Sequence, residues 1–154
     1  MNISKVVVFR AGNEEYALPI EHVISIEKLE NINSIPNMPS YMKGVVKVRG
    51  ELIPVLDVNC IFYQEDTRVN ENVKLIVVQS EELTSALIVK EAKEILDIQE
   101  KQLKTIPVGA FQATKYFTAV ASVNERLITI IQPDLFVSSL DGIGFVKEEL
   151  ISHQ

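Results

Sequence analysis

The chain has 154 residues, of which 47% are hydrophobic and 23% are charged, and its formal net charge is -6. This composition is typical of a globular protein and excludes the disordered and fibrous classes. The acidic balance and the scattered lysines and arginines also argue against nucleic acid and anionic lipid as partners, because both attract concentrated positive charge.

The cysteine content and the hydropathy pattern predict a cytoplasmic protein. Cys60 is the single cysteine, so no disulfide can form within the chain, and a reducing compartment is the expected setting. The N-terminal residues lack the pattern of a signal peptide. No apolar stretch approaches the roughly 20 residues that span a bilayer, so we expect no direct membrane insertion.

Short β-type segments dominate the chain from its N-terminus. Strands are predicted at residues 5–10, 15–20, 23–29, 42–49, 52–57, 73–79, 84–89, 92–98, 116–123 and 126–132. Gly50 and Glu51 are predicted to form a type II′ hairpin turn, since glycine stands at the first central position. Short helices are predicted at 59–63, 133–138 and 145–152. The regular strand spacing favours small barrels or a sandwich.

The chain is predicted to consist of two similar halves joined by a polar linker at 64–72. Ala17 and Leu18 recur 69 residues later, the Ile-Pro pair at 35–36 recurs at 106–107, and the segment 52–57 recurs at 127–132. We therefore expect a single domain over 1–154, with approximate sub-barrels at 11–63 and 73–137. The N-terminal strand and the C-terminal helix would cross between them.

Residues with catalytic chemistry are sparse. His22 and His153 belong to no spaced set of metal ligands, and Cys60 reads as a packing residue in a short apolar helix. Asp57 and Asp134 are interpreted as caps of the helices that follow them. This pattern favours a binding module over an enzyme, and we expect no metal.

The segment 36–57, PNMPSYMKGVVKVRGELIPVLD, strongly resembles the signature of the CheW family of bacterial chemotaxis adaptors. The likeness rests on Ile-Pro at 35–36, Pro-x-Tyr-x-x-Gly at 39–44, Arg-Gly at 49–50 and Leu-Ile-Pro-Val-Leu-Asp at 52–57. It extends from about residue 5 to residue 136. The resemblance implies a mainly β fold of two SH3-like five-stranded barrels packed side by side, with short helices after the hairpins and at the C-terminus.

The resemblance also implies a function and partners. Family members are scaffolds that bind the regulatory domain of the histidine kinase CheA and the cytoplasmic tip of methyl-accepting chemoreceptors, at receptor–kinase arrays beneath the membrane. No cofactor comes with this function. The alternative from another class is a stand-alone small-molecule sensor that binds a ligand in the groove between the barrels, and an enzyme ranks third.

Four candidate partner-binding residues lie in the signature hairpin. The resemblance places Arg49 in the partner-binding hairpin, although an ordinary strand-end arginine is the alternative. Gly50 is favoured as turn chemistry over a direct contact. Lys43 and Gly44 are candidates for the kinase-facing surface.

Three further candidates lie on predicted strands. Val23 and Val45 are either core residues or exposed apolar contacts, and alternation alone leaves both interpretations open. Ser25 stands where family members often carry a glutamate that helps to bind the kinase. Serine cannot supply that charge, and Glu27 is the candidate to replace it.

Overall fold

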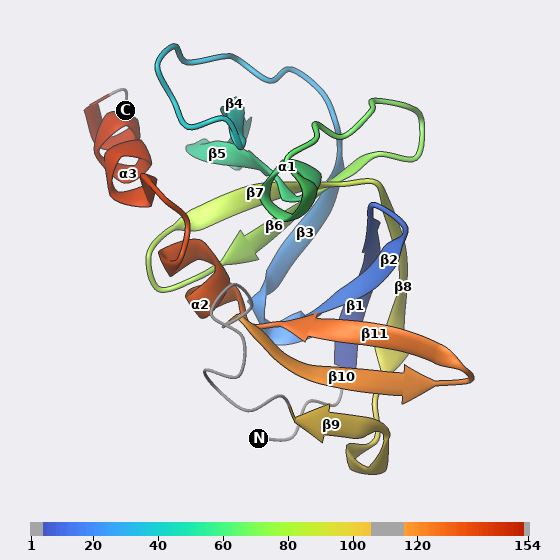
Figure 1. The fold of residues 1–154 in the computed structure, drawn as a ribbon. Helices are drawn as coiled ribbons and strands as arrows, with labels where there is room; N and C mark the ends of the chain where they lie inside the picture. The colour runs from blue at the N-terminus through green and yellow to red at the C-terminus, as the bar shows by residue number, and fades with distance from the viewer. Residues whose placement is uncertain (1–4, 106–115, 153–154) are drawn as a thin grey trace.

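The computed structural model describes residues 5–105 and 116–152, and these form mainly β-strands (Figure 1). The strands are β1 (Lys5–Ala11), β2 (Glu14–Pro19), β3 (Val23–Lys28), β4 (Met42–Val48), β5 (Glu51–Asp57), β6 (Lys74–Gln79), β7 (Thr84–Val89), β8 (Glu91–Asp97), β9 (Leu103–Thr105), β10 (Phe117–Val123) and β11 (Arg126–Ile131). The helices are α1 (Val58–Tyr63), α2 (Pro133–Ser138) and α3 (Ile143–Ser152), with 3-10 turns at Ile20–His22 and Glu100–Gln102.

The strands form two sheets. Over the described residues, one has six strands in the order β8-β1-β2-β11-β10-β9, and the other has five in the order β3-β6-β7-β5-β4. In Figure 1 the five-stranded sheet lies above the six-stranded sheet. The predicted mainly β fold with two units and few short helices is confirmed. The sixth strand, β9, was not predicted.

The two halves of the chain exchange their first hairpins. Strands β1 and β2 of the first half join β8 to β11 of the second half, whereas β6 and β7 of the second half join β3 to β5 of the first. The sheets therefore draw on residues 5–19 with 91–131 and on residues 23–89. The predicted division into 11–63 and 73–137 is wrong at these points, because sequence similarity identifies the repeat but not which half each hairpin pairs with.

The strand register agrees with the repeat residue by residue. In the five-stranded sheet, Val55 of β5 lies beside Ala86 of the parallel strand β7. In the six-stranded sheet, Ile130 of β11 lies beside Ala17 of β2. These are the positions that the sequence repeat pairs, so the two sheets are equivalent structures. The Ile-Pro repeat at 106–107 lies outside the described residues.

Equivalent contacts begin the two short helices. Asp57 accepts hydrogen bonds from the N–H groups of Asn59 and Cys60, as predicted for a cap. The cap of α2 is Gln132, whose side chain accepts from the N–H of Asp134. Asp134 is thus inside the first turn, and its predicted capping role is wrong.

A central apolar core joins the sheets, and a smaller core lies within each. Aromatic rings run through the central core: the Phe62 ring of α1 lies 4.8 Å from Tyr16 of β2 and 5.9 Å from Phe136 of α2, between ring centroids. Since these residues come from different sheets and helices, the cluster fixes the sheets relative to each other.

Helix α3 packs back on the central core. Ile143, Val146 and Leu150 are buried, whereas Phe145 and Ile151 are exposed. No helix within the described residues is long and apolar enough to span a membrane.

Candidate partner-binding site

The tip of the β4–β5 hairpin is a strained turn that displays Arg49. Arg49 has a φ of 52° and Gly50 a φ of 83°, and Val48 pairs with Glu51. Positive φ at both central residues defines a type I′ turn, so the predicted type II′ turn around Gly50 and Glu51 is wrong. Both tip residues are exposed. Glycine fits the second position, whereas arginine adopts the left-handed conformation at a cost.

Lys43 lies at a bulge in β4 and is held by an ion pair. The register shifts between Met42 and Gly44, which leaves Lys43 as the extra residue. Its Nζ lies 2.6 Å from Oδ1 of Asp66 in the loop after α1. This hydrogen bond and the nearby charge of Lys43 lower the pKa of Asp66. Lys43 therefore connects the hairpin to that loop.

Gly44 is required by a close backbone contact. Val45 donates to and accepts from the backbone of Asn33, with N···O distances of 2.8 and 2.9 Å. A Cβ on Gly44 would come within 2.4 Å of the Asn33 carbonyl oxygen, and the φ of Gly44 is 148°. The glycine of the signature thus admits the neighbouring chain and is itself buried.

Val45 contributes to the core and not to an exposed contact. It is 6% exposed and belongs to the central apolar cluster. Val46 faces the smaller core of the five-stranded sheet. The bulge at Lys43 and the second core on the other side of the strand together bury both valines. Val45 was predicted as a candidate partner-binding residue, and the structure corrects this, because its side chain offers almost no surface to a partner.

Val23 and Ser25 lie on β3, at the opposite edge of the five-stranded sheet from β4. Val23 is half-buried against the central core. Ser25 lies beside Val77 of β6, and its hydroxyl has no hydrogen-bond partner among the described residues. The candidate residues thus form two separate groups, one on each edge strand of this sheet.

Two exposed apolar residues on β3 were not among the candidates predicted from the sequence. Ile24 is 37% exposed and Ile26 is 44% exposed, and β3 is paired on one side by β6. An edge strand with free backbone groups and apolar side chains is a surface that partner proteins use. Because alternation in residues 23–29 fits either face, only the bulge between Val23 and Ser25 decides the orientation.

Polar contacts hold the loop after α1 in place. The buried Asp57 accepts from the N–H of Thr67 at 2.8 Å and from its hydroxyl at 2.6 Å. Asn59 donates to the carbonyl of Glu65 at 2.7 Å and accepts from the N–H of Gly12 at 2.8 Å. The predicted linker is thus attached to the hairpin that ends in Asp57.

Of the residues weighed for chemistry, His22 and Cys60 are described, whereas His153 lies outside the described residues. Nδ1 of His22 lies 3.1 Å from the carbonyl of Gln79, and burial raises the pKa of the Cys60 thiol. Over residues 5–105 and 116–152, no cluster of three or more histidine, cysteine or acidic residues is placed to hold a metal.

Known proteins are similar to this chain in sequence. Residues 5–141 match the CheW-like domain family. The chain is 28% identical over 148 residues to the chemotaxis protein CheW of Klebsiella aerogenes, covering 96% of this chain and 89% of the relative. Its identity to the chemotaxis protein CheW of Bacillus subtilis is 26%, covering 94% of each.

A solved structure has the same fold. The crystal structure of the scaffolding protein TtCheW from Thermoanaerobacter tengcongensis superposes with a TM-score of 0.79 at 26% sequence identity. The superposition covers 92% of this chain and 91% of the other. The likeness therefore extends over both sheets and is not confined to the hairpin signature.

Proposed function

The chain belongs to the CheW family, whose members are scaffold proteins of chemotaxis, and from this premise we propose that it is a non-catalytic adaptor that couples chemoreceptors to a CheA-type histidine kinase. The partners are the regulatory domain of the kinase and the cytoplasmic tip of the receptors. The protein would then work in the cytoplasm, at receptor–kinase arrays beneath the membrane.

The observation that carries this proposal is the position of two exposed surfaces on opposite edges of one sheet. One is the Arg49–Gly50 tip of β4 and β5, and the other is β3 with Ile24 and Ile26. An adaptor must hold two partners at once, and surfaces on opposite edges allow this without a steric clash. The tip offers an exposed positive charge, and β3 offers apolar side chains.

The test is a calorimetric titration of this protein with the isolated kinase regulatory domain and, separately, with a receptor-tip fragment. Arg49→Asn removes the charge and keeps the turn, because asparagine adopts a positive φ readily. Arg49→Ala would remove the charge but strain the turn. Loss of one side-chain contact at an interface core costs about 2 kcal/mol, or roughly 30-fold in affinity.

Matched variants locate each partner. Asn124→Arg places arginine in the equivalent turn between β10 and β11, where both central residues also have positive φ, and should leave both affinities unchanged. Ile26→Asp changes the other surface. We expect Arg49→Asn and Ile26→Asp to weaken different partners. Weakening of the same partner by both, or of neither, would reject the two-surface arrangement, and no binding by the folded native protein would reject the adaptor function.

A further inference from the structure

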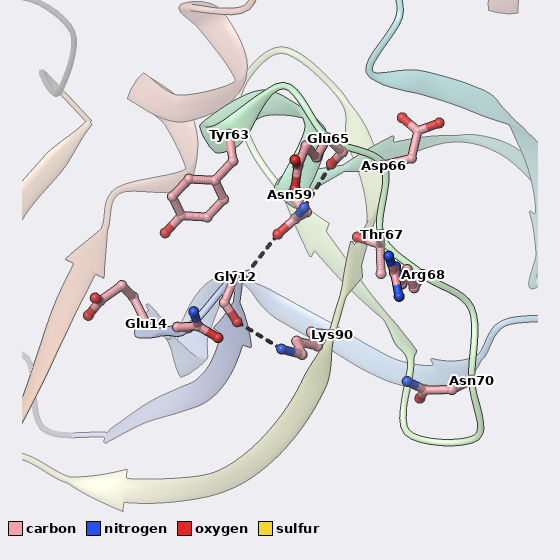
Figure 2. A pocket seen from close by; sticks show the side chains of 11 residues that line it. Gly12, Glu14, Asn59, Tyr63, Glu65, Asp66, Thr67, Arg68, Asn70 and Lys90 are labelled. Carbon is pink, nitrogen blue, oxygen red and sulfur yellow. Dashed lines mark hydrogen bonds between the residues drawn. The ribbon is translucent and has the colours of Figure 1, made fainter.

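A polar pocket lies apart from both proposed partner surfaces. Its volume is about 640 Å³, within the range of roughly 300 to 1,000 Å³ typical of small-molecule sites. The walls come from three places: the turn between β1 and β2, the end of α1 with the loop after it, and Lys90 between β7 and β8. Figure 2 shows the side chains around it. The pocket therefore draws on both sheets.

Specific contacts build the wall between Gly12 and α1. The N–H of Gly12 donates to Asn59, and the carbonyl of Gly12 accepts from Lys90 at 3.2 Å (Figure 2). Gly12 has a φ of 60°, and a Cβ there would come within 2.7 Å of the Tyr63 ring. The glycine thus allows the exposed tyrosine to lie over the turn as one side of the pocket.

The opposite wall is a fixed loop that carries an unpaired cation. Asp57 holds the backbone and hydroxyl of Thr67, and Asp66 is held by Lys43. Arg68, which follows Thr67, is exposed and forms no hydrogen bond or ion pair with any described residue. Its backbone is therefore placed by its neighbours while its guanidinium remains available.

Charges of both signs share the pocket without neutralising each other. Glu14 and Glu65 are acidic, and Arg68 and Lys90 are basic. Among the described residues none of the four forms an ion pair, and Lys90 donates only to a carbonyl. In Figure 2 Glu14 lies on the left, beside Tyr63, whereas Arg68 lies on the right. A ligand with a single charge would lie near a side chain of the same charge and be repelled by it.

We propose that this pocket binds a small zwitterion, a short peptide with free ends, with its ammonium toward Glu14 and its carboxylate toward Arg68 and Lys90. Charge-assisted hydrogen bonds at both ends supply the selectivity, and arginine can grip a carboxylate with two N–H groups. Neither partner surface is used, so ligand and protein partners bind together. The site adds a small-molecule input to the adaptor.

The test uses three probes in an NMR titration of the full chain: trialanine with free ends, N-acetyl-trialanine and trialanine amide. We expect saturable shifts of the Gly12, Arg68 and Lys90 amides with free trialanine, and affinity about tenfold lower for each blocked form, the loss of one charged hydrogen bond. In Arg68→Gln the free peptide should bind about tenfold more weakly, and amidation should then cost nothing further.

Two further variants complete the design. Glu14→Gln should make acetylation cost nothing further, and Lys101→Gln, an exposed lysine outside the pocket, should behave as the native protein. No saturable shift, equal affinity for the three probes, or sensitivity to one end alone would overturn the zwitterion site. Because the kinase titration is separate, each of these outcomes is independent of the adaptor proposal.

Discussion

Edge strands β3 and β8 occupy equivalent places in the two sheets, yet their side chains differ in chemistry. On β8, Lys93 lies 3.1 Å from Glu15 of β2, and Glu94 lies 2.7 Å from Arg126 of β11. Arg126 also forms two hydrogen bonds with Glu15, at 2.7 and 3.1 Å. This charge network connects three strands of the six-stranded sheet.

Within the part of the chain that the structure describes, the equivalent positions on β3 carry no such network. Glu94 lies beside Val8 and Ser25 lies beside Val77, and both strands have their bulge at the same point. In the same repeat, Ile24 is equivalent to Lys93, and Glu51 is equivalent to Arg126. Both edges keep one exposed isoleucine, Ile26 on β3 and its equivalent Ile95 on β8. They differ at the bulge, where β3 has the exposed Ile24 and β8 has the ion-paired Lys93. The difference favours β3 as the edge available to a partner.

The largest expected loss of stability is at Gly44, and it should exceed the loss at the equivalent residue of the other sheet, Ala119. Both follow a bulge, and they lie beside Val55 and Ile130 respectively. Gly44→Ala would drive a Cβ into the Asn33 carbonyl at a positive φ, so it should lower the free energy of unfolding by about 3 kcal/mol or more. Urea denaturation measures this loss.

The matched control for Gly44→Ala is the reverse change at the second site. Ala119→Gly should cost about 1 kcal/mol, the penalty of glycine within a strand. Similar losses for the two variants would show that Asn33 moves aside, and the steric reason for the signature glycine would then be wrong.

The second effect concerns Glu15, whose carboxylate has no counterpart in the other sheet. The hydrogen bonds from Arg126 and the ion pair with Lys93 lower the pKa of Glu15 to about 2. A carboxyl group with a lowered pKa stabilises the folded state at pH values above its ordinary pKa of about 4.5. This contribution is lost as the pH falls toward 2. The native protein should therefore lose stability across that window.

Glu15→Gln isolates this contribution. At pH 7 the variant should unfold with about 2 kcal/mol less free energy, the worth of hydrogen bonds to a charged group. The difference from the native protein should shrink as the pH falls from about 4.5 to 2. Thr84→Val, at the equivalent position of β7, should show a difference that does not change with pH. A constant difference for Glu15→Gln would refute the titration.

Local patterns predicted nearly every strand and helix, because alternation, turn residues and caps act over a few positions. The exchange of hairpins between sheets depends on long-range pairing, which no local pattern contains. The site divides in the same way. The signature located the hairpin whose exposed turn carries Arg49, whereas the burial of Val45 depends on the bulge at Lys43 and on a core contributed by distant strands.

The third expected loss of stability follows from removing either of two hydrogen bonds that join the sheets. Asn59 of α1 accepts from the N–H of Gly12 at 2.8 Å, and Asp134 of α2 accepts from the N–H of Glu81 at 2.7 Å. Asn59→Ala should cost about 1 to 2 kcal/mol, because Asn59 also holds the carbonyl of Glu65. Asp134→Ala loses a single bond and should cost about 1 kcal/mol.

Hydrogen exchange distinguishes the two bonds. Exchange of the Gly12 amide should accelerate in Asn59→Ala alone, and exchange of the Glu81 amide in Asp134→Ala alone. Acceleration of both amides in either variant would mean that the sheets separate as one unit and that the contacts are not independent.

The smallest expected change in the free energy of unfolding comes from rebuilding the ion pair of β8 on β3. The hydroxyl of Ser25 has no partner, so Ser25→Glu loses no hydrogen bond, but its carboxylate would face Glu51, the equivalent of Arg126. We expect a loss of about 0.5 kcal/mol, and Ser25→Glu with Glu51→Arg should recover it with a coupling energy of about 0.5 to 1 kcal/mol in a double-mutant cycle. A coupling energy of zero would show that the equivalence ends at the backbone. A positive value would identify Glu51 as the reason that serine suits β3.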